Sequence, residues 1–401
     1  MKPTVYISHR DDIPETPADF ADSIPLIEEM LAESLGPFNI GRMVSGKRVF
    51  IKPNFVRPNY QFNPAVASDP RAVIALGNIL KKAGAREIWV GDNPGVGLPF
   101  KDALKDIPWS ERWPEFGIRP FFYEDSPQLE IELPDSNLFR RMTVPRKLLE
   151  FDVFINLAKI KMHMHVGASL GIKNLYGLLC DDERMTFHRQ DVNRKVVEIM
   201  KRFTPDLTIL EGIWALEGQA PICGEPVKDF NTIVAGINPV AVDAAGSEII
   251  GVCPHELATT RLANAAGLGP MDLSEIEVRG AAIREVKRYL KRPVVSSMGA
   301  YPNCEVYELG AEVGTMSSLR HALDRLHYSG DLGKLPKITF VLGSPGPFYE
   351  PLEKRTGDLW LIGDDVQVAY SDVHNIFRVI GSSPHFGEII RALSGNYLGD
   401  R

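Results

Sequence analysis

The chain has 401 residues, which is more than one typical hydrophobic core and predicts two or three domains. Its 44% hydrophobic and 24% charged residues are typical of a soluble globular protein, and a net charge of −7 without a Lys/Arg block argues against nucleic-acid binding. The four cysteines form no CxxC pair, so the usual zinc spacing is excluded and no iron–sulfur cluster is expected.

The sequence has no run of about 18 apolar residues, so no membrane span is predicted. The N-terminus, MKPTVYISHRDD, also lacks the apolar core of a signal peptide. We therefore expect a cytoplasmic protein that does not bind a membrane. Composition leaves open whether the chain forms a homo-oligomer.

The first hundred residues alternate predicted helices and strands. Pro53 ends the first strand because it cannot donate to a central ladder, and Asp69-Pro70 combines a capping side chain with a proline in the first turn of a helix. The strand–helix–strand order favours parallel pairing through a right-handed crossover. The predicted elements are a helix at 22–33, a strand at 48–51, a helix from Ser68-Asp69-Pro70 to Gly84, and a strand at 87–90.

A glycine-rich loop, 91–97, follows the strand at 87–90 and carries Asp92. Prolines interrupt it, and neither the dinucleotide fingerprint nor the P-loop lysine is present. The loop is therefore either a turn that positions Asp92 or an anion site built from backbone amides. The following segment, 100–150, is predicted to be a surface insertion.

The apolar run 151–157 predicts a buried strand, and a dense group of titratable residues comes after it. If the run from Lys161 to His165 is extended, both of its histidines lie on one face. The group would sit where the strand runs out into a loop, at the sheet edge where α/β proteins bind ligands. Its members are Lys159, Lys161, His163, His165, Lys173 and His188.

The second half continues the α/β alternation and predicts further strand ends that carry polar groups. Strands are predicted at 207–210, 231–236, 275–278, 337–342, 358–362 and 377–380, and helices from Asn238-Pro239, from Leu257, at 317–326 and at 386–393. Together with Lys52 and Asp92, the strand ends at Glu211 and Gly236 predict one shared pocket. The expected fold is an open, mostly parallel sheet flanked by helices, with a second, smaller α/β domain. The expected division is a main domain at 1–280 with its insertion at about 100–150, a helical connector at 281–330, and the smaller domain at 331–401.

Several ordered motifs resemble the domain-of-unknown-function family DUF362, over about residues 48–280. The family has no settled activity, so the resemblance implies the fold and not the reaction. Many members carry a ferredoxin-like cysteine cluster, which this chain lacks, so no electron-transfer role is implied. The motifs are Ile51-Lys52-Pro53-Asn54, Val90-Gly91-Asp92-Asn93-Pro94-Gly95, Ile155-Asn156-Leu157 with Lys159 and Lys161, Gly171-Ile172-Lys173-Asn174-Leu175-Tyr176-Gly177, Glu217-Gly218 and Asn238-Pro239-Val240-Ala241-Val242-Asp243.

A fainter resemblance concerns the order His163, Lys173, His188, which is similar to that of the lactate racemase family. There the lysine carries a nickel-pincer cofactor and the histidines act as ligand or acid/base. The resemblance implies Lys173 as the attachment or anion-binding lysine and the two histidines as its flanking imidazoles. The chain departs from that family at Leu170-Gly171-Ile172, where the family is richer in glycine.

These residues define a candidate site in which histidines transfer protons and lysines hold an anion. The predicted catalytic residues are His163, His188 and Lys173. The predicted ligand-binding residues are Lys52, Asn54, Asp92, Asn93, Gly95, Lys159, Lys161, Asn174 and Glu217. The predicted ligands of a divalent metal are Asp92, His163, His188, Glu211 and Asp243.

Three functions remain open at this point. The first is an enzyme that acts on a small carboxylate or phosphate metabolite, of racemase, isomerase or metal-assisted type. The second is a protein that binds a cofactor or an anion without turnover. The third is a structural subunit, in which the histidines and lysines are ordinary hydrogen-bonded or solvated groups.

Overall fold

The computed structural model describes residues 2–14, 20–58, 60–95, 97–136, 138–181, 191–293, 301, 303–344, 357–364, 366 and 375–399. The chain divides into two compact units. The first unit comprises Met1–His163, Ala168–Met185 and Val196–Arg292, and the second comprises Met164–Gly167, Thr186–Lys195 and Pro293–Arg401. None of the helices in the described ranges is long and apolar enough to span a membrane.

The first unit is built on a large sheet, which has ten strands in the described part of the chain. The strand order is β12-β1-β11-β9-β7-β2-β3-β4, with β10 paired to β9 and β8 to β7. From β9 to β4 the neighbours are parallel, whereas β11 is antiparallel to both β9 and β1. The expected mostly parallel sheet is therefore confirmed. The strands are β1 (Thr4–His9), β2 (Arg48–Lys52), β3 (Glu87–Val90), β4 (Ile118–Pro120), β7 (Val153–His163), β8 (Gly167–Ser169), β9 (Leu207–Glu217), β10 (Glu225–Val227), β11 (Thr232–Gly236) and β12 (Glu277–Gly280).

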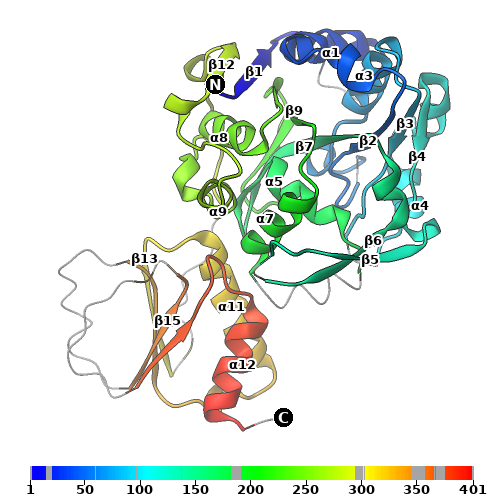
Figure 1. The fold of residues 1–401 in the computed structure, drawn as a ribbon. Coiled ribbons are helices and arrows are strands. Elements are labelled where there is room, and N and C mark those ends of the chain that lie inside the picture. The colour runs from blue at the N-terminus through cyan, green and yellow to red at the C-terminus, as the bar shows by residue number, and fades with distance from the viewer. Residues whose placement is uncertain are drawn as a thin grey trace. The chain divides into compact units, whose positions relative to one another are not determined.

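Helices cover both faces of this sheet, with α1 and α3 on one side and α5 and α8 on the other (Figure 1). The predicted helix starts are confirmed: Asp69 Oδ1 accepts from the Arg71 N–H at 2.9 Å before α3, and Asn238 Oδ1 accepts from the Ala241 N–H at 3.0 Å before α8. The helices are α1 (Phe20–Leu35), α2 (Ile40–Val44), α3 (Pro70–Lys82), α4 (Phe100–Ala103), α5 (Gly171–Asn174), α7 (Val192–Arg202), α8 (Pro239–Ile249), α9 (Ala258–Ala265) and α10 (Ile283–Val286).

Strand β7 is longer than the predicted 151–157. It continues to His163, so Lys159 and Lys161 lie on a buried strand and not in a loop. The sequence alternates here, with Ile160 and Met162 buried between the lysines and the histidine. The strand persists because the amino groups of both lysines find hydrogen-bond acceptors inside the protein.

The segment 100–150 is not a surface insertion. Residues Ile118–Pro120 form β4, which extends the large sheet by pairing with β3. Phe100 and Trp113 are buried and stack on Phe55, with ring centroids 5.9 and 6.5 Å apart. The separate part is a two-stranded antiparallel sheet of β5 (Gln128–Glu132) and β6 (Arg141–Pro145). The aromatic residues of this segment therefore fill the core of the first unit.

The second unit has its own parallel sheet, in the order β13-β14-β15-β16, and its own hydrophobic core around Leu323, Phe340 and Trp360. The expected smaller α/β domain near the C-terminus is confirmed. Its elements are β13 (Cys304–Leu309), α11 (Val313–Tyr328), β14 (Ile338–Gly343), β15 (Asp358–Ile362), β16 (Ile376–Val379) and α12 (Phe386–Tyr397).

The expected helical connector at 281–330 differs from the structure. Strand β13 pairs with β14, and Leu319 and Leu323 of α11 are buried in the core of the second unit. The sequence does not reveal β13 because it is an edge strand with Glu305 and Glu308 on it, which dilutes the apolar pattern.

Candidate functional site

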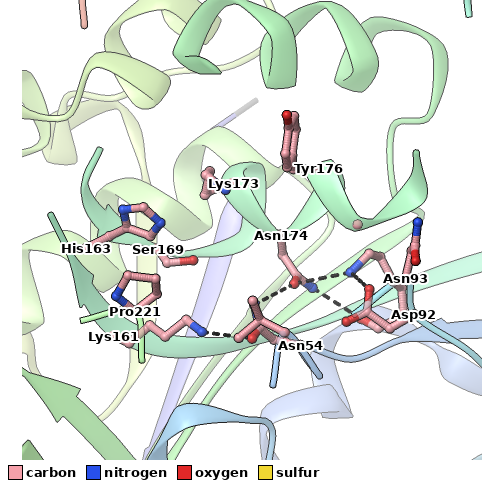
Figure 2. Close-up of a pocket in the computed structure, with 13 residues that line it drawn as sticks. Asn54, Asp92, Asn93, Lys161, His163, Ser169, Lys173, Asn174, Tyr176 and Pro221 are labelled. Carbon is pink, nitrogen blue, oxygen red and sulfur yellow. Dashed lines mark hydrogen bonds and ion pairs between the residues drawn. The ribbon is translucent and has the colours of Figure 1, made fainter. Parts of the chain in front are cut away.

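An open pocket of about 420 Å³, part of it continuous with solvent, lies at the carboxyl ends of β2, β3 and β7 (Figure 2). Parallel strands deliver the residues that follow them to one edge of a sheet, which is why segments far apart in sequence meet here. The lining residues are Lys52, Asn54, Val56, Asp92, Asn93, Lys161, His163, Ser169, Lys173, Asn174, Tyr176, Gly177 and Pro221. Eight of them are residues that the sequence singled out: Lys52, Asn54, Asp92, Asn93, Lys161, His163, Lys173 and Asn174.

A buried ion pair joins the ends of β2 and β3. Lys52 Nζ lies 2.7 Å from Asp92 Oδ1, and the two side chains are 1% and 4% exposed. Lys52 Nζ also donates to Pro53 O at 3.0 Å, and Asp92 Oδ2 accepts from the Phe55 N–H at 2.7 Å. Asp92 is thereby held by the protein itself, and its negative charge is matched by Lys52.

The backbone of Gly177 packs directly against this ion pair. A Cβ atom at position 177 would lie 2.7 Å from Lys52 Nζ and would also overlap Asp92 Oδ1. The Gly177 carbonyl accepts from the Asn93 N–H at 3.2 Å. The glycine therefore lets the backbone approach the pair more closely than any side chain would allow.

A chain of amide side chains crosses the floor of the pocket. Asn54 Nδ2 donates to Asn174 Oδ1 at 3.0 Å, and Asn174 Nδ2 donates to Asn156 Oδ1 at 2.8 Å. Asn174 Oδ1 also accepts from Lys52 Nζ at 3.3 Å. Figure 2 shows Asn174 between Asn54 and Asp92. The amides thus link Lys52 on β2 to Asn156 in the first half of β7, and they fix the positions of Asn54 and Asn174 in the pocket.

Lys161 differs from Lys52 in the kind of group that it contacts. Its Nζ donates to Asn54 Oδ1 at 2.9 Å and to Val66 O at 3.0 Å, and both of these acceptors are neutral. Burial holds the pKa of the Lys161 amine well below its usual range, and the neighbouring charges of Lys173 and Lys159 lower it further. The surroundings of Lys161 therefore favour the uncharged amine.

Lys173 is the most exposed of the lysines that line the pocket. It is half-buried on α5, and its Nζ lies 4.8 Å from the centroid of the Tyr176 ring. His163, the last residue of β7, is 8% exposed and lines the same pocket. Both groups can reach a molecule that enters from solvent.

Asp243 holds the turn that carries Lys173 and Asn174. Its two carboxylate oxygens accept from the N–H groups of Gly171 at 2.7 Å and Ile172 at 2.9 Å. Burial raises the pKa of Asp243 to about 7, although these two hydrogen bonds act in the opposite direction. Asp243, which the sequence suggested as a metal ligand, therefore accepts the first two backbone N–H groups of α5 and fixes the start of that helix.

Lys159 and Glu211 form a second buried ion pair that does not line the pocket. Lys159 Nζ lies 3.1 Å from Glu211 Oε1, and both side chains are fully buried. Glu211 also accepts from the N–H groups of Asp69 and Ile213, at 3.0 and 2.8 Å. Burial raises the pKa of Glu211, and Lys159 opposes this change. The predicted roles in ligand or metal binding do not fit groups that are already paired with each other.

Two further candidates lie outside the pocket. The Gly95 N–H donates to Val56 O at 2.6 Å, so this amide is not directed at an anion. Glu217, at the end of β9, lies 3.0 Å from Lys291 Nζ and accepts from the Lys291 N–H at 2.9 Å. Of the two alternatives for the glycine-rich loop, this contact favours the turn that positions Asp92 over an anion site.

The predicted metal site is not assembled from the residues that can be placed. Across the described ranges, no three His, Cys, Asp or Glu side chains are grouped so that they could hold a metal ion. His188 lies outside the described residues. His165 belongs to the second unit, where its carbonyl accepts from Ser383 Oγ at 3.2 Å.

Sequence reasoning missed five lining residues. Gly177 and Tyr176 belong to the motif that contains Lys173, and the repeated small residues of that motif were a usable signal for a close backbone approach. Val56, Ser169 and Pro221 carry no sequence signal, because only the folded chain brings them to this edge.

Comparison with known proteins places the chain in a family. The thylakoid-associated protein sll1697 of Synechocystis is 30% identical over 258 residues, which span 60% of this chain and 74% of that protein. The model of the domain of unknown function DUF362 matches residues 49–248. The chain belongs to the DUF362 family. The DUF362 segment contains all thirteen residues that line the pocket, from Lys52 to Pro221.

Two solved structures resemble this DUF362 protein weakly. A protein from Thermotoga maritima has a TM-score of 0.32 and 14% identity, and the similarity covers 83% of this chain and 71% of that one. The lactate racemase apoprotein from Thermoanaerobacterium thermosaccharolyticum has a TM-score of 0.40 and 9% identity, covering 86% of this chain and 71% of that one.

Proposed function

We propose that this DUF362 protein is an enzyme that binds a small organic anion, a carboxylate or a phosphate, in the pocket at the ends of β2, β3 and β7. The observation that supports the proposal is the charge of the lining residues. Among the described lining residues three are lysines, Lys52, Lys161 and Lys173, and one is a carboxylate, Asp92, which is paired with Lys52. Lys161 favours the uncharged amine, so Lys173 is the lysine placed to bind an anion. A half-buried ammonium group attracts an anion more strongly than the same group would in water.

Lys173 is the side chain that binds the anion in this proposal. Its side chain is half-buried at the pocket, and its ammonium group lies over the Tyr176 ring, so it is the lysine of the pocket that is most accessible to a ligand from solvent. Lys52 and the amides of Asn54 and Asn174 complete the polar floor beneath it.

His163 supplies the acid/base chemistry. An imidazole titrates near neutral pH and can accept a proton from, or return it to, a carbon or oxygen beside the bound anion. Proton transfer of this kind is the central step of racemases and isomerases that act on hydroxy acids and related metabolites. His188 would be the second such group by its sequence spacing, but it lies outside the described residues.

The described residues of the pocket do not fit a divalent metal ion held by protein side chains alone. The usual metal ligands among them are Asp92 and His163, and Asp92 already contacts Lys52 and the Phe55 N–H. Three lysine side chains surround them and would repel a cation if charged. No step of the proposed chemistry runs through such a group.

Anion binding is tested first, by calorimetry and thermal shift with phosphate, oxalate and lactate. Lys173→Met should weaken binding about tenfold or more, because a charge-assisted hydrogen bond is worth roughly 1.5–3 kcal/mol. Lys47→Met, at an exposed position away from the pocket, is the matched control and should bind as the unmodified protein does. Equal affinity in both variants would contradict the proposed site.

Catalysis is tested by deuterium exchange. Hydroxy acids that bind are incubated with the protein in D₂O, and exchange at the carbon beside the carboxylate is followed by NMR. His163→Gln should abolish exchange but retain binding. If the hydroxy acids bind but none of them exchanges its hydrogen for deuterium, the protein binds anions without turnover. That result would contradict the enzymatic part of the proposal.

A further inference from the structure

We infer that Lys161 is the nucleophile of this pocket and forms an imine with a ligand that carries a carbonyl group beside its anionic group, as in a 2-oxo acid. The inference rests on the proposed function for the anion, and it adds a substrate class and a covalent step. It concerns a different residue from those assigned above to anion binding and proton transfer.

Among the buried lysines of β2 and β7, the partners of Lys161 set it apart. Lys52 is 2.7 Å from the Asp92 carboxylate, and Lys159 is 3.1 Å from the Glu211 carboxylate, so both are held as ammonium ions. Lys161 is just as buried, at 1% exposed, yet its Nζ donates to an amide oxygen and to a backbone carbonyl. A positive charge at this position would lack an adjacent counter-ion.

The number of acceptors matches an uncharged amine. A neutral amine has two N–H groups and one lone pair, and Asn54 Oδ1 and Val66 O together take both N–H groups. The lone pair is then left for an electrophile. Burial and the nearby charges of Lys173, Lys159 and Lys52 act in the same direction, against the single opposing charge of Asp92.

Strand β7 brings the amine and the acid/base group to the same pocket. Lys161 and His163 are two residues apart with buried Met162 between them, so their side chains leave the strand on one face about 7 Å apart along it. Figure 2 shows both side chains at the pocket, with Lys161 directed toward Asn54. A ligand whose carboxylate is held by Lys173 can therefore present its carbonyl to Lys161 within reach of His163.

The covalent step balances without an external oxidant or reductant. The Lys161 lone pair forms a C–N bond to the carbonyl carbon, and one of the two protons on the amine nitrogen passes to the carbonyl oxygen to give a neutral carbinolamine. His163 then protonates the hydroxyl, the C–O bond breaks, and water leaves as the C=N bond forms. The protonated imine keeps one N–H, which can still donate to Asn54 Oδ1 or to Val66 O. The overall change is neutral amine plus carbonyl plus the proton from His163 to protonated imine plus water, and His163 is left as the neutral imidazole.

The test is reductive trapping on the full-length chain with glyoxylate and borohydride, followed by peptide mass mapping. Borohydride supplies the hydride that converts the imine into a stable secondary amine. The adduct should map to Lys161 and should be absent in Lys161→Met. Glycolaldehyde, an aldehyde of similar size without the carboxylate, should be trapped at least about tenfold less, because it lacks the charge-assisted contact with Lys173. Lys47→Met should be trapped like the unmodified protein.

The outcomes separate this inference from the proposed function. An adduct that maps mainly to Lys173 or to surface lysines would overturn the assignment of Lys161, and peptide mapping shows this in the unmodified protein even if Lys161→Met fails to fold. Glyoxylate that binds in a Lys173-dependent manner but is never trapped would overturn the imine and leave the anion site standing. Absence of both binding and trapping would overturn both.

Discussion

At the scale of single residues, the partner of a buried charge separates a structural role from a chemical one. Lys52, Lys159 and Lys161 all follow or lie on apolar strands, and all are about 1% exposed. Lys52 and Lys159 contact carboxylates, whereas Lys161 contacts neutral oxygens. A paired ammonium group is fixed and of low reactivity, and an unprotonated amine is a nucleophile.

The pair of Lys159 and Glu211 should prove structural. Lys159→Met leaves the Glu211 carboxylate buried without its cation, so the free energy of unfolding should fall by about 3–5 kcal/mol. Urea denaturation measures this loss. The double variant Lys159→Met/Glu211→Gln should recover a large part of it, because the amide retains an oxygen acceptor and carries no charge. If Lys159→Met lowers the free energy of unfolding by less than about 1 kcal/mol, the pair contributes little to stability and the prediction is wrong.

At the scale of elements, the site depends on two segments, β7 and α5, that supply lining side chains and are held in place by buried polar contacts. Strand β7 runs on to His163 because its polar side chains are satisfied inside the protein. The short helix α5 is held by Asp243, whose two oxygens accept the first N–H groups of the helix. Asp243, which lies on a different helix, α8, therefore fixes the position of Lys173 and Asn174.

Asp243 should make stability depend on pH in a defined direction. Its pKa is about 7 in the folded chain and 3.8 as the ordinary value, so between these pH values the folded state holds a proton that the unfolded state has released. The free energy of unfolding should therefore fall as pH rises through that window, by about 4 kcal/mol from this group.

The variant Asp243→Asn isolates this contribution. The difference in unfolding free energy between the unmodified protein and the variant, measured by urea denaturation at several pH values from 4 to 8, should change in favour of the variant as pH rises. A difference that stays constant over this range would show that Asp243 does not titrate as its burial implies.

At the scale of the whole molecule, each of the two units has a hydrophobic core of its own within the described residues. The core of the first unit includes Leu76, and that of the second unit includes Leu323. The units are not consecutive stretches of sequence, because Met164–Gly167 and Thr186–Lys195 are assigned to the second unit. Within that unit Asp191 accepts from the N–H and the hydroxyl of Ser382, which is 191 residues away.

Two cores predict two unfolding transitions in calorimetry. Leu323→Ala should destabilise the second unit by about 2–5 kcal/mol and lower one transition temperature, because it leaves a cavity in a closed core. Leu76→Ala is the matched change in the first unit and should lower the other transition. A single transition that moves equally in both variants would contradict separate cores.

Local rules made much of the first unit predictable from its sequence. The Asp69-Pro70 and Asn238-Pro239 pairs start helices because caps and proline geometry act within a few residues. The order of strands and helices implied parallel pairing, and parallel pairing implied that Lys52, Asp92 and Lys173 would reach one sheet edge. Those rules, together with the family motifs, named eight of the residues that line the pocket.

The partners of the buried lysines and the place of β13 in a sheet depend instead on contacts between residues that are distant in sequence. Whether a lysine is paired depends on Glu211 for Lys159 and on Asn54 for Lys161, and neither partner is adjacent in sequence. The same holds for β13, whose place in a sheet depends on β14 and not on its own diluted apolar pattern. Sequence by itself determined where this protein gathers its polar groups, since that depends on local periodicity and strand order. Only the tertiary structure decided which of them are neutralised and which stay reactive, since that depends on burial and on partners brought together by folding.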